Sequence, residues 1–155
     1  TCCEEVICLM SLRELYQEMI VDHGKHPRHF GLLPESNHNQ VGHNPLCGDK
    51  LVLFVLEKEG VVTDASFQGS GCAISVASAS LMLESIIGKP VTEIERLFNQ
   101  FHLLVTEGKT PEDDIGKLAV FGGVAEFPMR VKCASLAWHT LMAALSNQAK
   151  EVSTE

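Results

Sequence analysis

The chain has no long hydrophobic run and carries little positive charge. None of its apolar stretches approaches the about 20 residues that a membrane-spanning helix needs. Its 155 residues include 12 lysines and arginines against 20 aspartates and glutamates, a formal net charge of −8. Proteins that bind nucleic acid or anionic lipid concentrate basic residues instead, so we expect neither nucleic acid nor a membrane as a partner. The N-terminus also lacks a basic flank followed by an apolar leader, and we therefore expect a cytoplasmic protein.

Short motifs that announce a function are missing as well. No two cysteines form a compact CxxC pair, and "GSGC" at 69–72 lacks the GK[ST] ending of a phosphate-binding loop. The chain is nevertheless 45% hydrophobic, which is enough apolar material for the core of one domain. We expect a single domain over residues 11–150, preceded by an extension or expression artefact (1–10) and followed by a tail (151–155).

The first half of the chain predicts one helix and a small sheet. Apolar residues at helical spacing, after the capping box "SLRE", predict an amphipathic helix over residues 11–23. Gly, Pro, Asn and His dominate residues 23–45, which predicts a loop with a short strand near Val41. Two β-rich runs then meet at Glu59-Gly60, a pattern typical of an antiparallel hairpin.

The second half is expected to be mainly helical. Small residues interleaved with large apolar ones predict a tightly packed helix after Cys72, ending near Gly88. The tetrapeptide "TEIE" that starts at Thr92 matches a capping box and predicts another helix, and Pro128 suits the first position of a final helix. The fold class predicted is α+β, with a small antiparallel sheet of about three strands packed against several α-helices.

Three of the six cysteines stand at the predicted ends of elements. In a reducing compartment, dispersed thiols bind metals or catalyse more often than they form disulfides. Cys47 is separated from Asp49 only by Gly48, whose backbone freedom lets both side chains of a bent turn point at one spot. Cys72 and Cys133 lie at helix starts, where unpaired N–H groups favour a thiolate. The other three are Cys2, Cys3 and Cys8.

Three thiolates and one carboxylate supply the four ligands that a tetrahedral Zn²⁺ prefers, and thiolates also suit iron–sulfur clusters. The spacing does not establish such a site, since 25 positions separate Cys47 from Cys72 and 61 separate Cys72 from Cys133. Free cysteine is also a common small apolar core residue, so packing stays open as the role of the last two. We expect solvated side chains for the five histidines in or beside the polar loop, which are His23, His26, His29, His38 and His43. His102 and His139 lie on predicted amphipathic helices, where a hydrogen-bonded or surface histidine is expected rather than a ligand.

Three separated motifs, in this order, resemble the U-type iron–sulfur cluster assembly proteins, the family of IscU and the N-terminal part of NifU. They are "CGD" at 47–49, "FQGSGCAISVASASLM" at 67–82 and "RVKCASLAW" at 130–138. The resemblance covers about residues 11–145. It implies an α+β fold whose three cysteines and aspartate converge on one exposed site. At that site, sulfur is received from a pyridoxal-phosphate cysteine desulfurase.

Three departures from the family's scaffold branch make the chain similar to the SufU branch. Lys132 stands where the scaffold branch has a histidine, "EFPMRVK" replaces an "LPPVK"-like chaperone-docking motif, and the interval over residues 98–127 is longer. The SufU branch implies a zinc-dependent sulfur acceptor that supplies downstream iron–sulfur assembly proteins. The scaffold reading, in which the same residues hold a [2Fe–2S] cluster, stays as an alternative, and so does a small redox or interaction domain whose cysteines only pack the core.

Carried over by position, the resemblance assigns four metal ligands and one basic residue. Cys47, Asp49, Cys72 and Cys133 would bind Zn²⁺, and Cys47 would take the persulfide sulfur. Arg130 would steady the site or the incoming partner.

Overall fold

The computed structural model describes residues 12–45, 48–109, 115–146 and 152–153. Three antiparallel strands form most of the sheet, as predicted: β1 (His38–Asn44), β2 (Asp49–Lys58) and β3 (Val61–Ser70). The short β4 (Val152–Ser153) pairs in parallel with β1, so the strand order is β3-β2-β1-β4.

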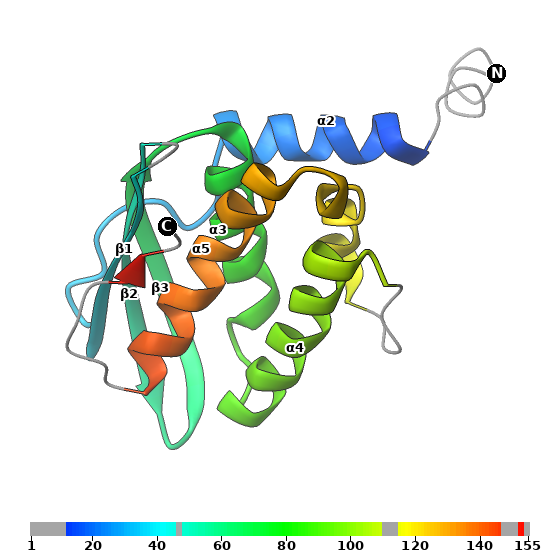
Figure 1. Ribbon diagram of the computed structural model, residues 1–155. Coiled ribbons are helices and arrows are strands. Elements are labelled where there is room, and N and C mark those ends of the chain that lie inside the picture. Colours follow the sequence, from blue (N-terminus) through cyan, green and yellow to red (C-terminus); the bar gives the residue numbers. More distant parts are fainter. Residues whose placement is uncertain (1–11, 46–47, 110–114, 147–151, 154–155) are drawn as a thin grey trace, which may run out of the picture.

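Helices cover one face of this sheet and complete the predicted α+β fold (Figure 1). The sheet contacts α5 and α3, α4 packs on α5 away from the sheet, and α2 lies across one end against α3. Within the described residues, no helix is both long and apolar enough to cross a membrane. The helices are α2 (Leu12–Lys25), α3 (Ala73–Ile86), α4 (Val91–Glu107) and α5 (Pro128–Leu145), with the 3₁₀ helices η1 (Gly116–Phe121) and η2 (Val124–Glu126).

The β2–β3 hairpin forms where the sequence predicts it. Glu59 and Gly60 both have positive φ, 53° and 79°, the combination that a two-residue type I′ turn requires. The turn fixes the pairing next to it, with Lys58 opposite Val61, and a one-residue register shift between Leu56 and Glu57 then places Leu53 opposite Phe67. Both side chains are buried on the face that the helices cover. The turn and the register shift together therefore decide which residues of the two strands enter the core.

The final helix begins at Pro128, as predicted, and is buried over most of its length. Trp138 has no exposed surface and stacks on Phe101 with ring centroids 5.1 Å apart, which joins α5 to α4. On its other side α5 approaches β1 closely, because a Cβ added at Gly42 would lie 2.1 Å from Thr140 Oγ1. A glycine in β1 thus sets the distance between the sheet and this helix.

The predicted capping box at Thr92 is wrong. Helix α4 begins at Val91, its N-cap is Pro90, and no side chain caps it. Pro90 forms an isolated bridge with Val61, and the Val91 N–H donates to Gly60 O at 2.8 Å. The chain is therefore held against the hairpin up to Pro90 and turns directly into the helix. Between α4 and α5, residues 116–121 and 124–126 are 3₁₀ helix, while residues 110–114 lie outside the described part.

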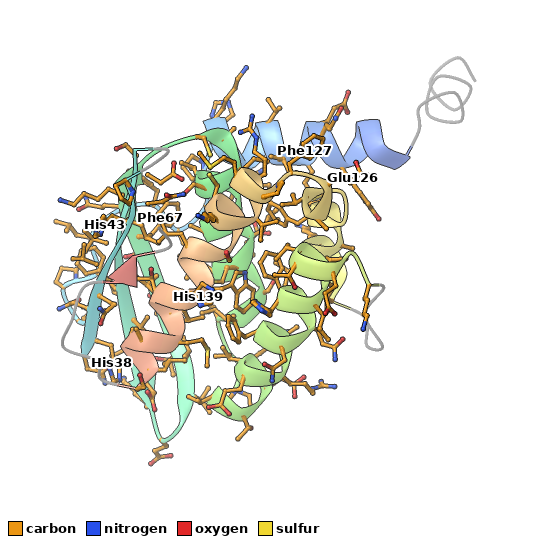
Figure 2. All side chains as sticks on the ribbon, in the orientation of Figure 1. His38, His43, Phe67, Glu126, Phe127 and His139 are labelled. Atoms are coloured by element: carbon orange, nitrogen blue, oxygen red, sulfur yellow. The ribbon has the colours of Figure 1, made fainter. Side chains whose placement is uncertain are left out.

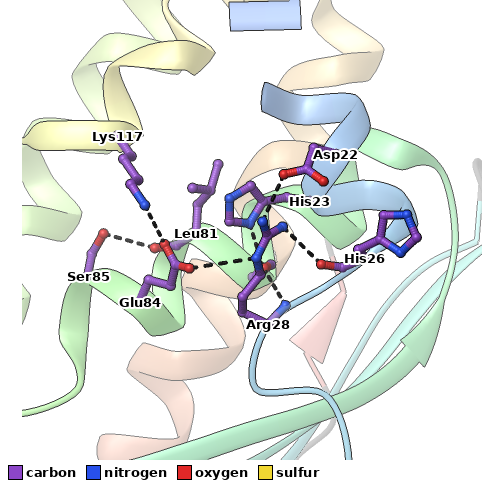
Figure 3. Close-up of polar contacts among 9 residues, drawn as sticks. Asp22, His23, His26, Arg28, Leu81, Glu84, Ser85 and Lys117 are labelled. Atoms are coloured by element: carbon purple, nitrogen blue, oxygen red, sulfur yellow. Dashed lines mark hydrogen bonds and ion pairs between the residues drawn. The ribbon is translucent and has the colours of Figure 1, made fainter. Parts of the chain in front are cut away.

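A polar cluster, buried only at His23 and Ser80, joins α2 to α3, and it contradicts the expectation that His23 is solvated (Figure 3). His23 is 3% exposed, and its Nδ1 lies 2.7 Å from Ser80 Oγ, which also accepts the Arg28 backbone N–H at 2.8 Å. The Arg28 guanidinium pairs with Asp22 at 2.8 Å and lies 4.0 Å from Glu84. Burial, with a smaller contribution from Arg28, holds the pKa of His23 below its usual value. The histidine therefore serves as a neutral connector between the two helices.

The other histidines lie nearer the surface. His26 and His29 are exposed, as expected, whereas His38 is partly covered and lies 3.1 Å from Glu57. His139, labelled on α5 in Figure 2, packs edge-on against His102 of α4 with ring centroids 6.1 Å apart. Burial, and secondarily His102, lowers the pKa of His139.

Candidate metal centre

Residues from three chain segments that are distant in the sequence lie close together at one site. Asp49 is the first residue of β2, Cys72 directly precedes α3, and Cys133 lies in the second turn of α5. One ligand atom from each side chain lies within 4.8 Å of the other two. Asp49 and Cys133 are buried, and Cys72 is half-buried. The structure thus brings together three of the four predicted ligands, and the fourth, Cys47, lies outside the described residues.

A hydrogen bond and a glycine hold the Asp49 carboxylate in place. Its Oδ1 accepts the backbone N–H of Cys72 at 2.9 Å. The neighbouring residue is Gly71, with φ of +157°, and a Cβ added there would lie 2.3 Å from Asp49 Oδ1 and 3.1 Å from Asp49 Cα. Any side chain at this position would therefore displace the carboxylate.

Both sulfur atoms accept hydrogen bonds from the surrounding structure. Cys72 is the N-cap of α3, and its Sγ accepts the N–H of Ser75 at 3.5 Å. Cys133 Sγ lies 3.9 Å from Asn44 Nδ2 at the end of β1. A helix N-terminus and a buried amide therefore direct N–H groups at the two sulfurs.

The residues present fit a divalent cation. Asp49 is 2% exposed, yet its Oδ2 has no hydrogen-bond partner among the described residues. Buried carboxylate oxygens are normally paired, and a cation would pair this one. Thiolate and carboxylate are zinc ligands, and tetrahedral zinc holds such atoms about 3.5–3.8 Å apart. A closure of about 1 Å would bring these three side chains to that separation.

Two basic residues, Arg130 and Lys132, precede Cys133 in α5. Three thiolates, a carboxylate and Zn²⁺ would carry a net charge of −2, which nearby cations offset. Arg130 is exposed and lies one helical turn before Cys133, and Lys132 is half-buried next to it. Within the described part of the chain, the Arg130 side chain makes no ion pair or hydrogen bond. Its neighbour Phe127, at the start of α5 in Figure 2, is 48% exposed.

Sequence reasoning missed Asn44, which is fully buried and lies opposite Asp49 in the β1–β2 register. One signal was present: Asn44 opens the stretch "NPLCGD" that contains Cys47 and Asp49. A polar residue directly before a motif of candidate ligands is itself a candidate for the site.

Comparison with known proteins identifies the family. The family model described as "NifU-like N terminal domain" matches residues 15–134. The chain is 38% identical over 144 residues to a protein of Streptococcus pyogenes serotype M1 named iron–sulfur cluster assembly scaffold protein IscU, covering 92% of this chain and 90% of that one. It is 39% identical over 133 residues to the zinc-dependent sulfurtransferase SufU of Bacillus subtilis, covering 84% and 89%.

A solved structure has the same fold over nearly its whole length. It is a protein of Fervidobacterium islandicum described as an iron–sulfur cluster assembly scaffold for the SUF system. The TM-score is 0.79 at 34% identity, covering 87% of this chain and 99% of the other. Fold, sequence and family model agree, and the chain therefore belongs to the family of NifU-like N-terminal domain proteins, together with relatives named IscU and SufU.

Proposed function

We propose that this protein is a zinc-dependent sulfur acceptor of iron–sulfur cluster assembly. It takes persulfide sulfur from a pyridoxal-phosphate cysteine desulfurase on Cys47 and passes it to downstream assembly proteins. The reaction belongs to the cytoplasm, where thiols stay reduced. The observation that carries the proposal is the meeting of Asp49, Cys72 and Cys133 within 4.8 Å, with one carboxylate oxygen buried and unpaired.

Each residue has a separate task in this proposal. Asp49, Cys72 and Cys133 hold the ion together with Cys47, which lies two residues before Asp49 in the chain. When bound, Zn²⁺ would keep its thiol ligands deprotonated near neutral pH. Arg130 is exposed one helical turn before Cys133, and there it meets an acidic group of the incoming partner.

The sulfur transfer itself needs no external oxidant. The Cys47 thiolate attacks the outer sulfur of the donor's persulfide. A new S–S bond forms on Cys47 as the donor's S–S bond breaks, and the donor cysteine leaves as a thiolate. A dithiol reductant later cleaves the Cys47 persulfide, which releases sulfide while the dithiol becomes a disulfide.

A second candidate function is that of a scaffold for a [2Fe–2S] cluster. Identity favours neither reading, since the chain is 38% identical to the IscU of S. pyogenes and 39% identical to SufU of B. subtilis. Thiolates suit iron–sulfur clusters as well as zinc. We prefer the zinc reading because Lys132 occupies the position before Cys133, where a histidine ligand would be expected of a scaffold.

One experiment tests the preferred reading directly. The purified protein is mixed with a cysteine desulfurase, cysteine and a dithiol reductant, and sulfide release is followed. We expect the wild type to raise the rate strongly and Cys47→Ala to abolish the increase. Cys8→Ala is the matched control, because it removes a thiol that the proposal does not use. Equal stimulation by Cys47→Ala and the wild type would refute the role of Cys47.

Metal analysis separates the two candidate functions. We expect about one zinc per chain and a colourless protein, since Zn²⁺ is d¹⁰. A brown protein that contains iron and sulfide, and that transfers its cluster to an apo-protein, would support the scaffold reading instead.

A further inference from the structure

Asn44 lies beside the candidate metal centre in an unusual state for a buried amide. Its side chain has no exposed surface, and its Nδ2 lies 3.9 Å from Cys133 Sγ. Its Oδ1 has no hydrogen-bond partner among the described residues, and the same is true of Oδ2 of Asp49, the residue opposite it on β2. Two unpaired buried oxygens therefore belong to one cross-strand pair at the edge of the site.

Such an arrangement does not stabilise the fold by itself. A buried amide with an unpaired oxygen costs free energy, and an apolar residue of similar size would avoid that cost. The Asn44 N–H faces a sulfur, and a thiolate has only acceptor positions, so an amide N–H is the complementary partner. Hydrogen bonds to a charged acceptor are shorter and stronger than those between neutral groups. The side chain is thus better suited to a metal-bound thiolate than to a neutral thiol.

We infer that Asn44 is a positioning residue of the metal centre: its amide N–H donates to Cys133 Sγ and holds that sulfur in the orientation needed to bind the ion. The inference rests on the proposed metal function of Asp49, Cys72 and Cys133. Groups that orient metal ligands typically change metal affinity by about 10- to 100-fold when they are removed. Asn44 therefore sets the affinity of the centre and the electronic environment of one sulfur without touching the ion.

The first test compares Asn44→Ala and Asn44→Asp with the wild type. Zinc affinity is measured by competition with a chromophoric chelator, and the sulfur environment by the thiolate-to-metal charge-transfer absorption of the cobalt-substituted protein. We expect zinc to bind Asn44→Ala about 10- to 100-fold more weakly. Asn44→Asp keeps the shape but replaces the donor by an acceptor, and we expect at least as large a loss. The charge-transfer band should shift in both variants.

Gln40→Ala is the matched control, because Gln40 is a second buried amide on the same face of β1. It should leave zinc affinity and the cobalt spectrum unchanged. The inference would be overturned, without the proposed function, if Asn44→Ala kept the zinc affinity and cobalt spectrum of the wild type. The same holds if Gln40→Ala lost as much zinc affinity as Asn44→Ala. A wild type that binds neither zinc nor cobalt would overturn the proposed function and this inference with it.

A second measurement needs no variant, so it holds even if both substitutions prevent folding. In wild-type protein loaded with cadmium-113, we expect a scalar coupling between the metal and the side-chain amide protons of Asn44, transmitted through the N–H···S hydrogen bond. Couplings from the backbone N–H of Ser75 through Cys72 serve as the positive control. A coupling at Ser75 without one at Asn44 would show that the amide does not donate to Cys133.

Discussion

Gly71→Ala is expected to damage the metal centre by pushing Asp49 out of place. The added Cβ would lie 2.3 Å from Asp49 Oδ1, so the hydrogen bond from the Cys72 N–H to that oxygen cannot survive. A hydrogen bond to a charged group contributes about 1.5–3 kcal/mol. A side chain at this positive φ costs about 1–2 kcal/mol more. The free energy of unfolding should therefore fall by about 2.5–5 kcal/mol.

Gly88→Ala separates the two contributions. Gly88 also has positive φ, +88°, but a Cβ there meets no atom within 4 Å. This control should lose only the backbone contribution of about 1–2 kcal/mol. Unfolding is followed in denaturant through the fluorescence of the single tryptophan, Trp138, which is fully buried.

Zinc affinity is the second measurement on the same two variants. Because Asp49 is displaced in Gly71→Ala, we expect its zinc affinity to fall by about 10- to 100-fold, whereas Gly88→Ala should keep the wild-type value. Equal losses of stability in the two variants, together with equal zinc affinities, would refute the proposed contact between residue 71 and the carboxylate.

Three further predictions concern the fold and the partner. The free energy of unfolding should fall as the pH drops below about 6.5, because His23 is protonated there in the unfolded chain but not in the folded chain, where its pKa is lowered. Denaturation at pH 7.5 and 5.5 should show a smaller pH dependence in His23→Gln than in the wild type, and an equal pH dependence would contradict this. Gly42→Ala should lower the free energy of unfolding by about 1–3 kcal/mol, because the added methyl group overpacks against the Thr140 hydroxyl. Adding Thr140→Ala should recover part of that loss, and strictly additive effects of the two substitutions on stability would argue against the clash. Arg130→Ala should weaken the stimulation of the desulfurase, seen as a higher protein concentration needed for the half-maximal effect. The zinc content should stay unchanged, and a loss of zinc would instead place Arg130 in the metal centre.

Local chemistry was sufficient to predict much of the fold. The Glu59-Gly60 turn and the proline at the start of α5 act through backbone angles within a few residues, so their effects can be derived from the sequence. The capping box at Thr92 failed for a non-local reason. Pro90 is held against Val61 of the hairpin, and that contact places the N-cap of α4 two residues before Thr92.

The candidate site depended on information that spacing does not carry. Cys72 and Cys133 are separated by 61 positions, and only the packing of α3 against α5 brings them together. The family resemblance supplied that grouping, whereas composition left core packing open. His23 illustrates the same limit, since its partner Ser80 is 57 residues away and the polar loop beside it favoured a solvated side chain.

The wide separation of the proposed ligands along the chain would link metal supply to protein lifetime. Asp49, Cys72 and Cys133 approach one another only when β2, α3 and α5 are assembled, so an ion that bridges them binds the native state and not the denatured ensemble. Free zinc at a hundred times its dissociation constant would add about 2.7 kcal/mol to the free energy of unfolding. A cell depleted of zinc would thus raise the unfolded fraction about a hundredfold and expose the chain to proteolysis. Under the proposed function, the abundance of this protein would then follow the zinc supply without a dedicated regulator.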